Sequence, residues 1–104
     1  MNNEQRFINL LGLAQRAGKL ITGEAQVLQS IRGQKAKLVV ISTDIGQATR
    51  KKISDKCTTY QVSLLTFMDR NVLSQAIGQP RTAVAIEDQG FAKALLKLNI
   101  GEGA

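Results

Sequence analysis

The stretch that decides the fold is residues 20–42, LITGEAQVLQSIRGQKAKLVVIS. It opens with two apolar residues that predict a very short strand, and it closes with the continuous apolar run Leu38–Ile41. A run without polar alternation is typical of a strand covered on both faces, so we expect Leu38–Ile41 at the centre of a sheet that lies between helices. The helix between these two strands is expected to start at Thr22 or Gly23 and to end at Gly33, where a left-handed residue is needed.

Helix and strand patterns alternate along the whole chain. Residues 63–67 and 82–86 predict two more strands, apolar residues at helical spacing predict four more helices, and the tail at residues 101–104 is expected to be frayed. Such alternation requires crossover connections, so residues 1–100 are predicted to form a single α/β domain. We expect a three-layer α/β/α sandwich with a mixed sheet of about four strands. The residues expected to cap the four further helices are Asn3, Asp44, Asp69 and Asp88.

Two of these helices have apolar faces that predict which side chains are buried. The helix after Asp44 is expected to bury Ile53, Cys57 and Tyr60, and the last helix is expected to bury Leu96 among others. The opposite face of the first of these helices is strongly basic and is interpreted as a solvated surface. Its basic residues are Arg50, Lys51, Lys52 and Lys56.

The composition argues against catalysis and against a bound metal or cofactor. The 104 residues include no histidine and one cysteine, so a histidine base is absent and the usual metal ligands are scarce. No serine lies in a Gly-x-Ser-x-Gly elbow, and the RAGK sequence at residues 16–19 lacks the flanking residues of a phosphate loop. We therefore expect a non-enzymatic protein with no metal, no cofactor and no small-molecule substrate.

The apolar segments and the first residues bear on where the protein is found. The apolar segments are too short to cross a bilayer, which requires about 20 residues. The first ten residues, MNNEQRFINL, do not resemble a secretion signal. We therefore expect a cytoplasmic protein without a membrane partner.

The positive charge is concentrated in the first part of the chain. The formal net charge is +6, and residues 1–60 contain ten Lys/Arg against four Asp/Glu, whereas residues 61–104 contain four of each. One basic face that meets a polyanion would explain this pattern, and a solvated basic surface without a partner is the alternative. Aromatic residues make up 4% of the chain, too few for a platform that stacks successive single-stranded bases, so structured RNA fits better.

Three segments, ITGEAQVLQSIRGQKAKLVVISTD, NVLSQAIG and TAVAIEDQGFA, carry a resemblance to a known family. Together with LLGLAQRAGKL they resemble the ribosomal protein L-seven-Ae family, which binds kink-turn RNA, and within it the bacterial YlxQ-type branch. The resemblance implies an α/β/α sandwich that recognises a sharply bent RNA through tandem sheared G·A pairs next to a bulge. The implied partner is a kink-turn in ribosomal or other RNA, with the ribosome as a further candidate.

The turn Thr22-Gly23-Glu24 has chemistry that suits such an RNA. Gly23 would let RNA approach the backbone, Thr22 offers a hydroxyl, and Glu24 could accept from the N1 and N2 donors of a guanine. Plain helix capping, with the carboxylate complementing the helix dipole, is the alternative.

Basic residues around this turn and one later loop complete the predicted interface. Four Lys and Arg residues that flank the turn unit are favoured as phosphate contacts over the basic face at residues 50–56. The loop from Ile77 to Thr82 should lie beside the turn, and an ordinary helix-to-strand connector is its alternative. The predicted RNA-binding residues are Lys19, Thr22, Gly23, Glu24, Arg32, Lys35, Lys37, Ile77, Gly78, Gln79, Arg81 and Thr82.

The chain departs from the family signature Gly-x-Asn-Glu-x-x-Lys at the start of this helix. A gapless match anchored on residues 32–33 places Thr22, Glu24, Ala25 and Leu28 at its Gly, Asn, Glu and Lys positions. RNA binding is expected to survive these changes better than kink-turn specificity. This resemblance also allows two other functions. The chain could be a protein-interaction module on the same fold, or the RNA-recognition subunit of a separate RNA-modifying enzyme.

Overall fold

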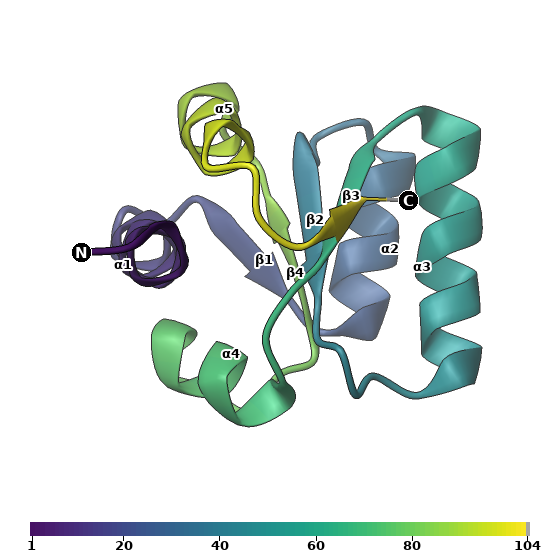
Figure 1. The fold of residues 1–104 in the computed structure, drawn as a ribbon. Helices are drawn as coiled ribbons and strands as arrows, with labels where there is room; N and C mark the ends of the chain where they lie inside the picture. The colour runs from purple at the N-terminus through teal and green to yellow at the C-terminus, as the bar shows by residue number, and fades with distance from the viewer. Residues whose placement is uncertain (104) are drawn as a thin grey trace.

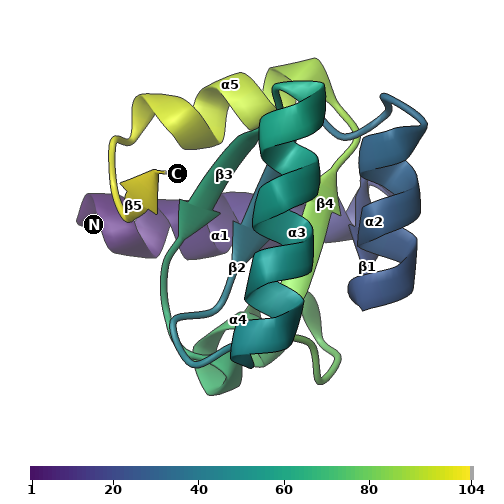
Figure 2. The ribbon, with the colours of Figure 1, turned by 90° about the vertical axis from the view of Figure 1, so that its right-hand side faces the viewer.

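The computed structural model describes residues 1–103 and is an α/β/α sandwich around one mixed sheet (Figure 1). The helices α1, α4 and α5 cover one face of the sheet, and α2 and α3 cover the other (Figures 1 and 2). The predicted three-layer architecture is confirmed. The helices are α1 (Asn3–Arg16), α2 (Glu24–Arg32), α3 (Gln47–Tyr60), α4 (Arg70–Ile77) and α5 (Gln89–Lys97). The strands are β1 (Leu20–Thr22), β2 (Leu38–Ile41), β3 (Ser63–Thr66), β4 (Ala83–Ile86) and β5 (Glu102–Gly103).

The strand directions decide which segments meet at each end of the sheet. The strand order is β1-β4-β2-β3-β5; β2 and β3 are parallel, and β4 is antiparallel to both β1 and β2. Therefore β1, β2 and β3 all end at the same end of the sheet, where α2, α3 and α4 begin (Figure 1). We call this the lower end, and we call the opposite end, where these strands begin, the upper end.

The apolar run 38–41 is the central strand β2, and all four of its side chains are buried, as expected. Leu38 and Val40 pack into the core beneath α1, α4 and α5, whereas Val39 and Ile41 pack into the core beneath α2 and α3. Alternate side chains of a strand point to opposite faces, so a strand that serves two cores must be apolar throughout. The largest fully buried side chains from the helices are Phe7, Leu11, Ile31, Ile53, Leu73 and Leu95.

Two of the predicted helix caps are confirmed and two are wrong. Asp69 and Asp88 cap α4 and α5, and each side chain accepts a backbone N–H of the first turn. The cap of α1 is Asn2, one residue before the predicted Asn3. Asp44 does not cap α3, because the chain runs on to Gly46 before the helix begins.

Three finer predictions, one about the end of α2 and two about buried side chains, are also wrong. Gly33 has a negative φ, and the left-handed residue is Gln34, because the turn continues until the Gln34 N–H donates to the Ile31 carbonyl. Tyr60 is 36% exposed because it is the last residue of α3. Leu96 is 39% exposed because it follows Leu95, which takes the inward position on α5.

The predicted frayed tail includes a short strand. Residues 102–103 form β5, which pairs antiparallel with the end of β3, and residue 104 lies outside the described residues. Within residues 1–103, each helix is too short or too polar to cross a bilayer.

Candidate nucleic-acid interface

The turn at residues 22–24 meets the loop between α4 and β4 at the lower end of the sheet. The Gly23 N–H donates to the Ala83 carbonyl at 3.2 Å, and Arg81 Nε donates to Thr22 Oγ1 at 3.1 Å. The two segments lie almost 60 residues apart in sequence, and antiparallel pairing of β1 with β4 brings them together. The prediction that this loop lies beside the turn is confirmed.

Gly23 has a backbone conformation that only glycine adopts readily. Its φ of +95° and ψ of 149° lie outside the regions open to residues with a Cβ. A Cβ at this position would lie 2.8 Å from Gln26 Oε1 and 3.9 Å from Arg81 Nε. Gly23 therefore sets the sharp angle between β1 and α2, and the side chains of Gln26 and Arg81 border the space that a Cβ would take.

Hydrogen bonds to α4 hold the loop at residues 78–82 in place. Gly78 is left-handed, with a φ of +76°, and its N–H donates to the Ser74 carbonyl at 2.8 Å. Ser74 Oγ accepts the Arg81 N–H at 3.0 Å, and the Gln79 N–H donates to the Ser74 carbonyl at 3.1 Å. Ile77, which was predicted to bind RNA, is only 4% exposed and packs into the core, so it offers no apolar surface to a ligand.

Helix α3 holds the Glu24 carboxylate. Thr49 Oγ1 donates to Glu24 Oε1 at 2.7 Å, and Lys52 Nζ lies 3.4 Å from Glu24 Oε2. The Thr49 hydroxyl and then Lys52 lower the pKa of the Glu24 carboxyl from its ordinary value. Glu24 is therefore a carboxylate that two side chains of α3 orient and that keeps free lone pairs, and its bonds are to α3 rather than to the start of its own helix.

Arg70 and Asp44 form a second ordered pair at the lower end. The Arg70 N–H donates to Asp44 Oδ1 at 3.0 Å, Nε donates to Oδ2 at 3.3 Å, and Nη2 donates to the Asp44 carbonyl at 2.7 Å. These bonds join the start of α4 to the loop that precedes α3. They explain why Asp44 does not cap α3, since its carboxylate is already engaged.

An open groove runs between the turn and the loop. It has a volume of about 420 Å³, and two arginines line it, Arg70 at the start of α4 and Arg81 in the loop. Three helices begin around it, so the positive ends of their dipoles and their free N–H groups favour anions here. The residues that line it are Gly23, Glu24, Arg70, Asn71, Ser74, Pro80, Arg81 and Thr82.

The four basic residues that were predicted to flank the turn lie instead at the upper end. The Lys37 N–H donates to the carbonyl of Ile86, the last residue of β4, whereas Gly23 is bonded to Ala83, the first. Helix α2 has nine residues, so its two ends lie about 13 Å apart. The expectation that these residues gather around the glycine turn is therefore wrong. They are Lys19, Arg32, Lys35 and Lys37.

Glu24 and Arg81 lie at the turn and its neighbouring loop as predicted, but two further charged residues near the turn were not predicted there. Lys52 belongs to the face interpreted as solvated, and Arg70 was not predicted at all. The signal that could have found Lys52 is the direction of the strands. Both β1 and β2 run antiparallel to β4, so α2 and α3, which follow β1 and β2, start at the same end of the sheet.

Cys57 is a core residue, as predicted. Its side chain is 3% exposed, and burial raises the pKa of the thiol to about 11. Among residues 1–103, no group of three or more His, Cys, Asp or Glu side chains could hold a metal ion.

One protein-family model matches most of the chain. The model of the ribosomal protein L7Ae/L30e/S12e/Gadd45 family matches residues 5–96. A curated protein of Enterococcus faecium, named RNA-binding protein YlxQ, is 45% identical over 91 residues, which is 88% of this chain and 88% of that protein. The protein of the same name from Bacillus subtilis (strain 168) is 46% identical over 90 residues, covering 86% of this chain and 90% of its own length.

Two solved structures have the same fold. A protein with unknown function from Bacillus halodurans C has a TM-score of 0.86 and 40% identity, covering 88% of this chain and 94% of its own. The Giardia lamblia 15.5kD RNA binding protein has a TM-score of 0.77, covering 92% of this chain and 83% of its own. Its identity is 17%, so this likeness concerns the fold alone.

Proposed function

We propose, because the chain belongs to the ribosomal protein L7Ae/L30e/S12e/Gadd45 family, that it binds structured RNA at the lower end of its sheet and that the preferred RNA is a kink-turn. The chain would act by binding alone, stabilising the bent form of an RNA in the ribosome or elsewhere. The two curated relatives named RNA-binding protein YlxQ support the coarser part of this proposal.

One observation carries the proposal, which is the junction of the turn at residues 22–24 with the loop at residues 78–82. The bonds from Gly23 to Ala83 and from Arg81 to Thr22 make the two segments one surface. A kink-turn brings phosphates of two helices together and exposes purine edges in a widened groove, so its recognition needs donors and cations close to each other. The junction supplies both within a single groove.

Each group of this surface has a role in the proposed complex. Arg70 and Arg81 contact the converging phosphates, and Gly23, which has no side chain, lets a base edge come close to the backbone. The free lone pairs of Glu24 accept from a guanine, in the orientation that Thr49 imposes. The backbone of Gly78 and the side chains of Gln79 and Thr82 complete the contact from the loop.

The test is a titration of the protein with a kink-turn duplex and with the same duplex after its G·A pairs are changed to Watson–Crick pairs. Calorimetry should give tighter binding of the kink-turn, and Arg81→Ala should remove most of the difference. The matched control is Arg6→Ala, which removes the same charge from the exposed surface of α1. Equal affinity of the unaltered protein for both duplexes would overturn the kink-turn proposal.

The salt dependence tests the electrostatic part of the same proposal. If about four phosphates are neutralised, log K should fall against log salt with a slope of roughly −3. A slope near zero would mean that the arginines do not meet phosphates.

A further inference from the structure

We propose that the upper end is a second RNA contact, which binds the phosphate backbone of a stem that extends from the RNA held at the lower end. This inference rests on the proposed function and adds a site to it. We call this surface the upper basic surface. It combines the four basic residues that were predicted beside the turn with two lysines of α5. Its members are Lys19, Arg32, Lys35, Lys37, Lys93 and Lys97.

Backbone hydrogen bonds bring the lysines of this surface together from separate parts of the chain. The Lys19 carbonyl accepts the Glu87 N–H at 2.9 Å, and the Lys37 N–H donates to the Ile86 carbonyl at 2.8 Å. Lys19 and Lys37 are therefore attached to two consecutive residues at the end of β4. The Lys35 N–H donates to the Ser30 carbonyl at 3.0 Å, which places Lys35 at the end of α2 on the same side.

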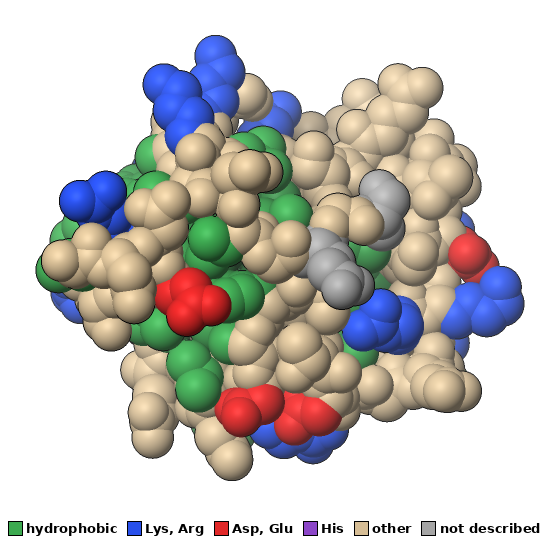
Figure 3. All heavy atoms as spheres, in the orientation of Figure 1, with side chains coloured by type: hydrophobic (Ala, Val, Ile, Leu, Met, Phe, Trp, Pro, Cys, Tyr) green, Lys and Arg blue, Asp and Glu red, His purple; other side chains and the backbone are tan. Residues whose placement is uncertain are grey.

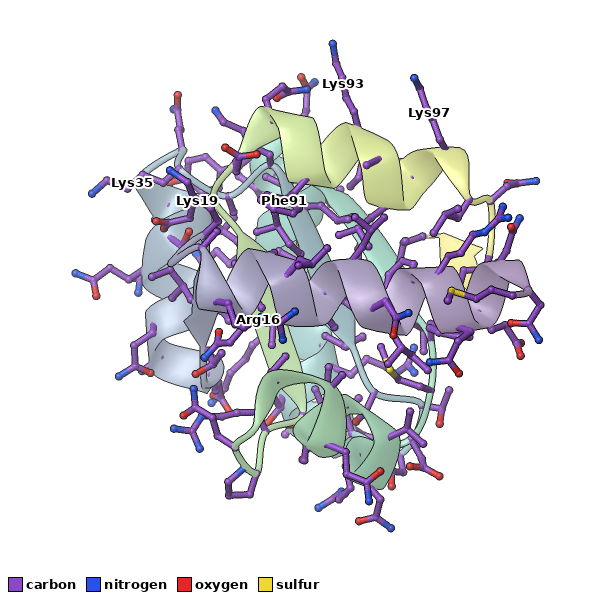
Figure 4. All side chains as sticks on the ribbon, turned by 90° about the vertical axis from the view of Figure 1, so that its left-hand side faces the viewer. Arg16, Lys19, Lys35, Phe91, Lys93 and Lys97 are labelled. Atoms are coloured by element: carbon purple, nitrogen blue, oxygen red, sulfur yellow. The ribbon has the colours of Figure 1, made fainter. Side chains whose placement is uncertain are left out.

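The cations of the upper basic surface are available for a ligand. All six are exposed, and within residues 1–103 none of them takes part in an ion pair. Figure 4 shows Lys93 and Lys97 pointing away from α5, and Lys19 and Lys35 projecting beside its start. In Figure 3, Lys and Arg side chains likewise stand over α5, apart from the carboxylates near α4.

The two carboxylates of this region are already engaged by the protein. Glu87 Oε2 accepts Ser30 Oγ at 2.6 Å, and Asp88 Oδ2 accepts the Phe91 N–H at 2.8 Å as the cap of α5. Both side chains are half-buried. Six cations against two carboxylates leave the surface clearly positive.

Stabilisation of helix dipoles does not account for this charge. Arg32 and Lys97 lie in the last turns of α2 and α5, where a cation favours the helix. Lys19, Lys35 and Lys37 lie beyond the helix ends and Lys93 lies in the middle of α5, so four of the six cations have no such explanation.

A hollow beside α2, which Ile21 and Glu87 also line, lies between the two ends of the sheet. It has a volume of about 400 Å³ and extends from Gln26, whose side chain reaches towards Gly23, through Gln29 to Lys35. The amide groups of the two glutamines can donate to sugar and phosphate oxygens along this path. One RNA can therefore follow α2 over the 13 Å or so between the lower groove and the upper basic surface.

The test uses two kink-turn RNAs, one with short stems and one with a stem lengthened by about one helical turn. The variant is the triple substitution Lys19→Gln, Lys35→Gln and Lys37→Gln. Its control, which has the same net charge, is the triple substitution Arg6→Gln, Lys51→Gln and Lys56→Gln at exposed or partly exposed positions outside this surface. We expect the upper triple variant to weaken binding of the long RNA at least tenfold more than the control, and to make its salt slope less steep by about 2 to 3.

The short RNA separates this inference from the proposed function. Its affinity for the upper triple variant and for the charge-matched control should agree within about twofold, because it does not reach the upper basic surface. An equal loss of affinity for the long and the short RNA would overturn the second contact. No loss of affinity for either RNA would also overturn it, and would leave an acidic protein as the partner of the upper basic surface. If G·A replacement has no effect while the long RNA still depends on the three lysines, the kink-turn proposal fails and the second contact stands.

Discussion

Both ends of the sheet carry cations, but the two ends are built differently. At the lower end the cations are tied down, Arg70 by Asp44, Arg81 by Thr22 and Lys52 by Glu24. At the upper end the lysines have free heads on flexible stems. A fixed guanidinium can select one arrangement of phosphates, whereas a mobile ammonium accepts many. The comparison teaches that the same charge can serve shape recognition at one end and sequence-independent attraction at the other.

The largest effect is expected at Gly23, on which the geometry of the lower end depends. Gly23→Ala forces a residue with a Cβ into a glycine-only conformation, so we expect a loss of about 1–3 kcal/mol in the free energy of unfolding. Kink-turn binding should weaken at least tenfold. Chemical denaturation and calorimetry measure the two quantities.

The control for this prediction is Gly46→Ala at the start of α3. Gly46 has a φ of −60° and open space around its Cβ position, so the change in stability should stay below about 1 kcal/mol. Equal destabilisation by the two substitutions would mean that the conformation of Gly23 is not important.

The next largest effect concerns the bond between Arg81 and Thr22. Arg81→Lys keeps the charge but loses the Nε donor at 3.1 Å, so kink-turn affinity should fall by about tenfold, the value of one charge-assisted hydrogen bond. Thr22→Val should give a similar loss by removing the acceptor. If Arg81→Lys binds as well as the unaltered protein, the lower end contributes charge only and does not differ from the upper end.

A smaller effect is expected at Lys35, and it distinguishes the two ends by their part in the preference for kink-turn RNA. Lys35→Gln should reduce the salt slope for a long-stemmed RNA by about 0.7–0.9 and leave the preference for the kink-turn over its Watson–Crick control unchanged. Arg81→Ala should change that preference. Filter binding at several salt concentrations measures both, and a changed preference in Lys35→Gln would contradict the division of roles.

The smallest effect is a shift in the titration of Glu24. Because the Thr49 hydroxyl lowers the pKa of this carboxyl in the folded protein, Glu24 contributes stability above its ordinary pKa of 4.5, and this contribution is lost as the pH falls through the lowered value. Thr49→Val should move the pKa back towards 4.5, as read from the side-chain carbon resonance. An unchanged titration would show that Thr49 does not hold Glu24.

The local elements were predictable where short-range chemistry decides them. The apolar run 38–41 and the caps Asp69 and Asp88 follow from periodicity and from the acceptors at helix starts. Asp44 could not be placed in this way, because the competing donor is Arg70, 26 residues further along the chain.

The candidate site was predicted in its backbone and in two of its charges, Glu24 and Arg81, but not in the rest. The resemblance implied that the turn at residues 22–24 lies beside the later loop, and the structure brings them together. Which end of the sheet Lys35 or Lys52 occupies depends on strand direction and order. A count of charges along the sequence does not contain that information, so four of the five predicted basic residues, all but Arg81, were assigned to the wrong end.

The bonds between Arg70 and Asp44 have a consequence for the thermodynamics of association. A free arginine loses about 0.5–1.5 kcal/mol of rotamer entropy when a ligand immobilises it. Arg70 is already confined by its Nε and Nη2 bonds before any ligand arrives, so most of that entropic penalty falls on folding rather than on complex formation. An oxyanion in the groove therefore meets a donor whose orientation is settled in advance.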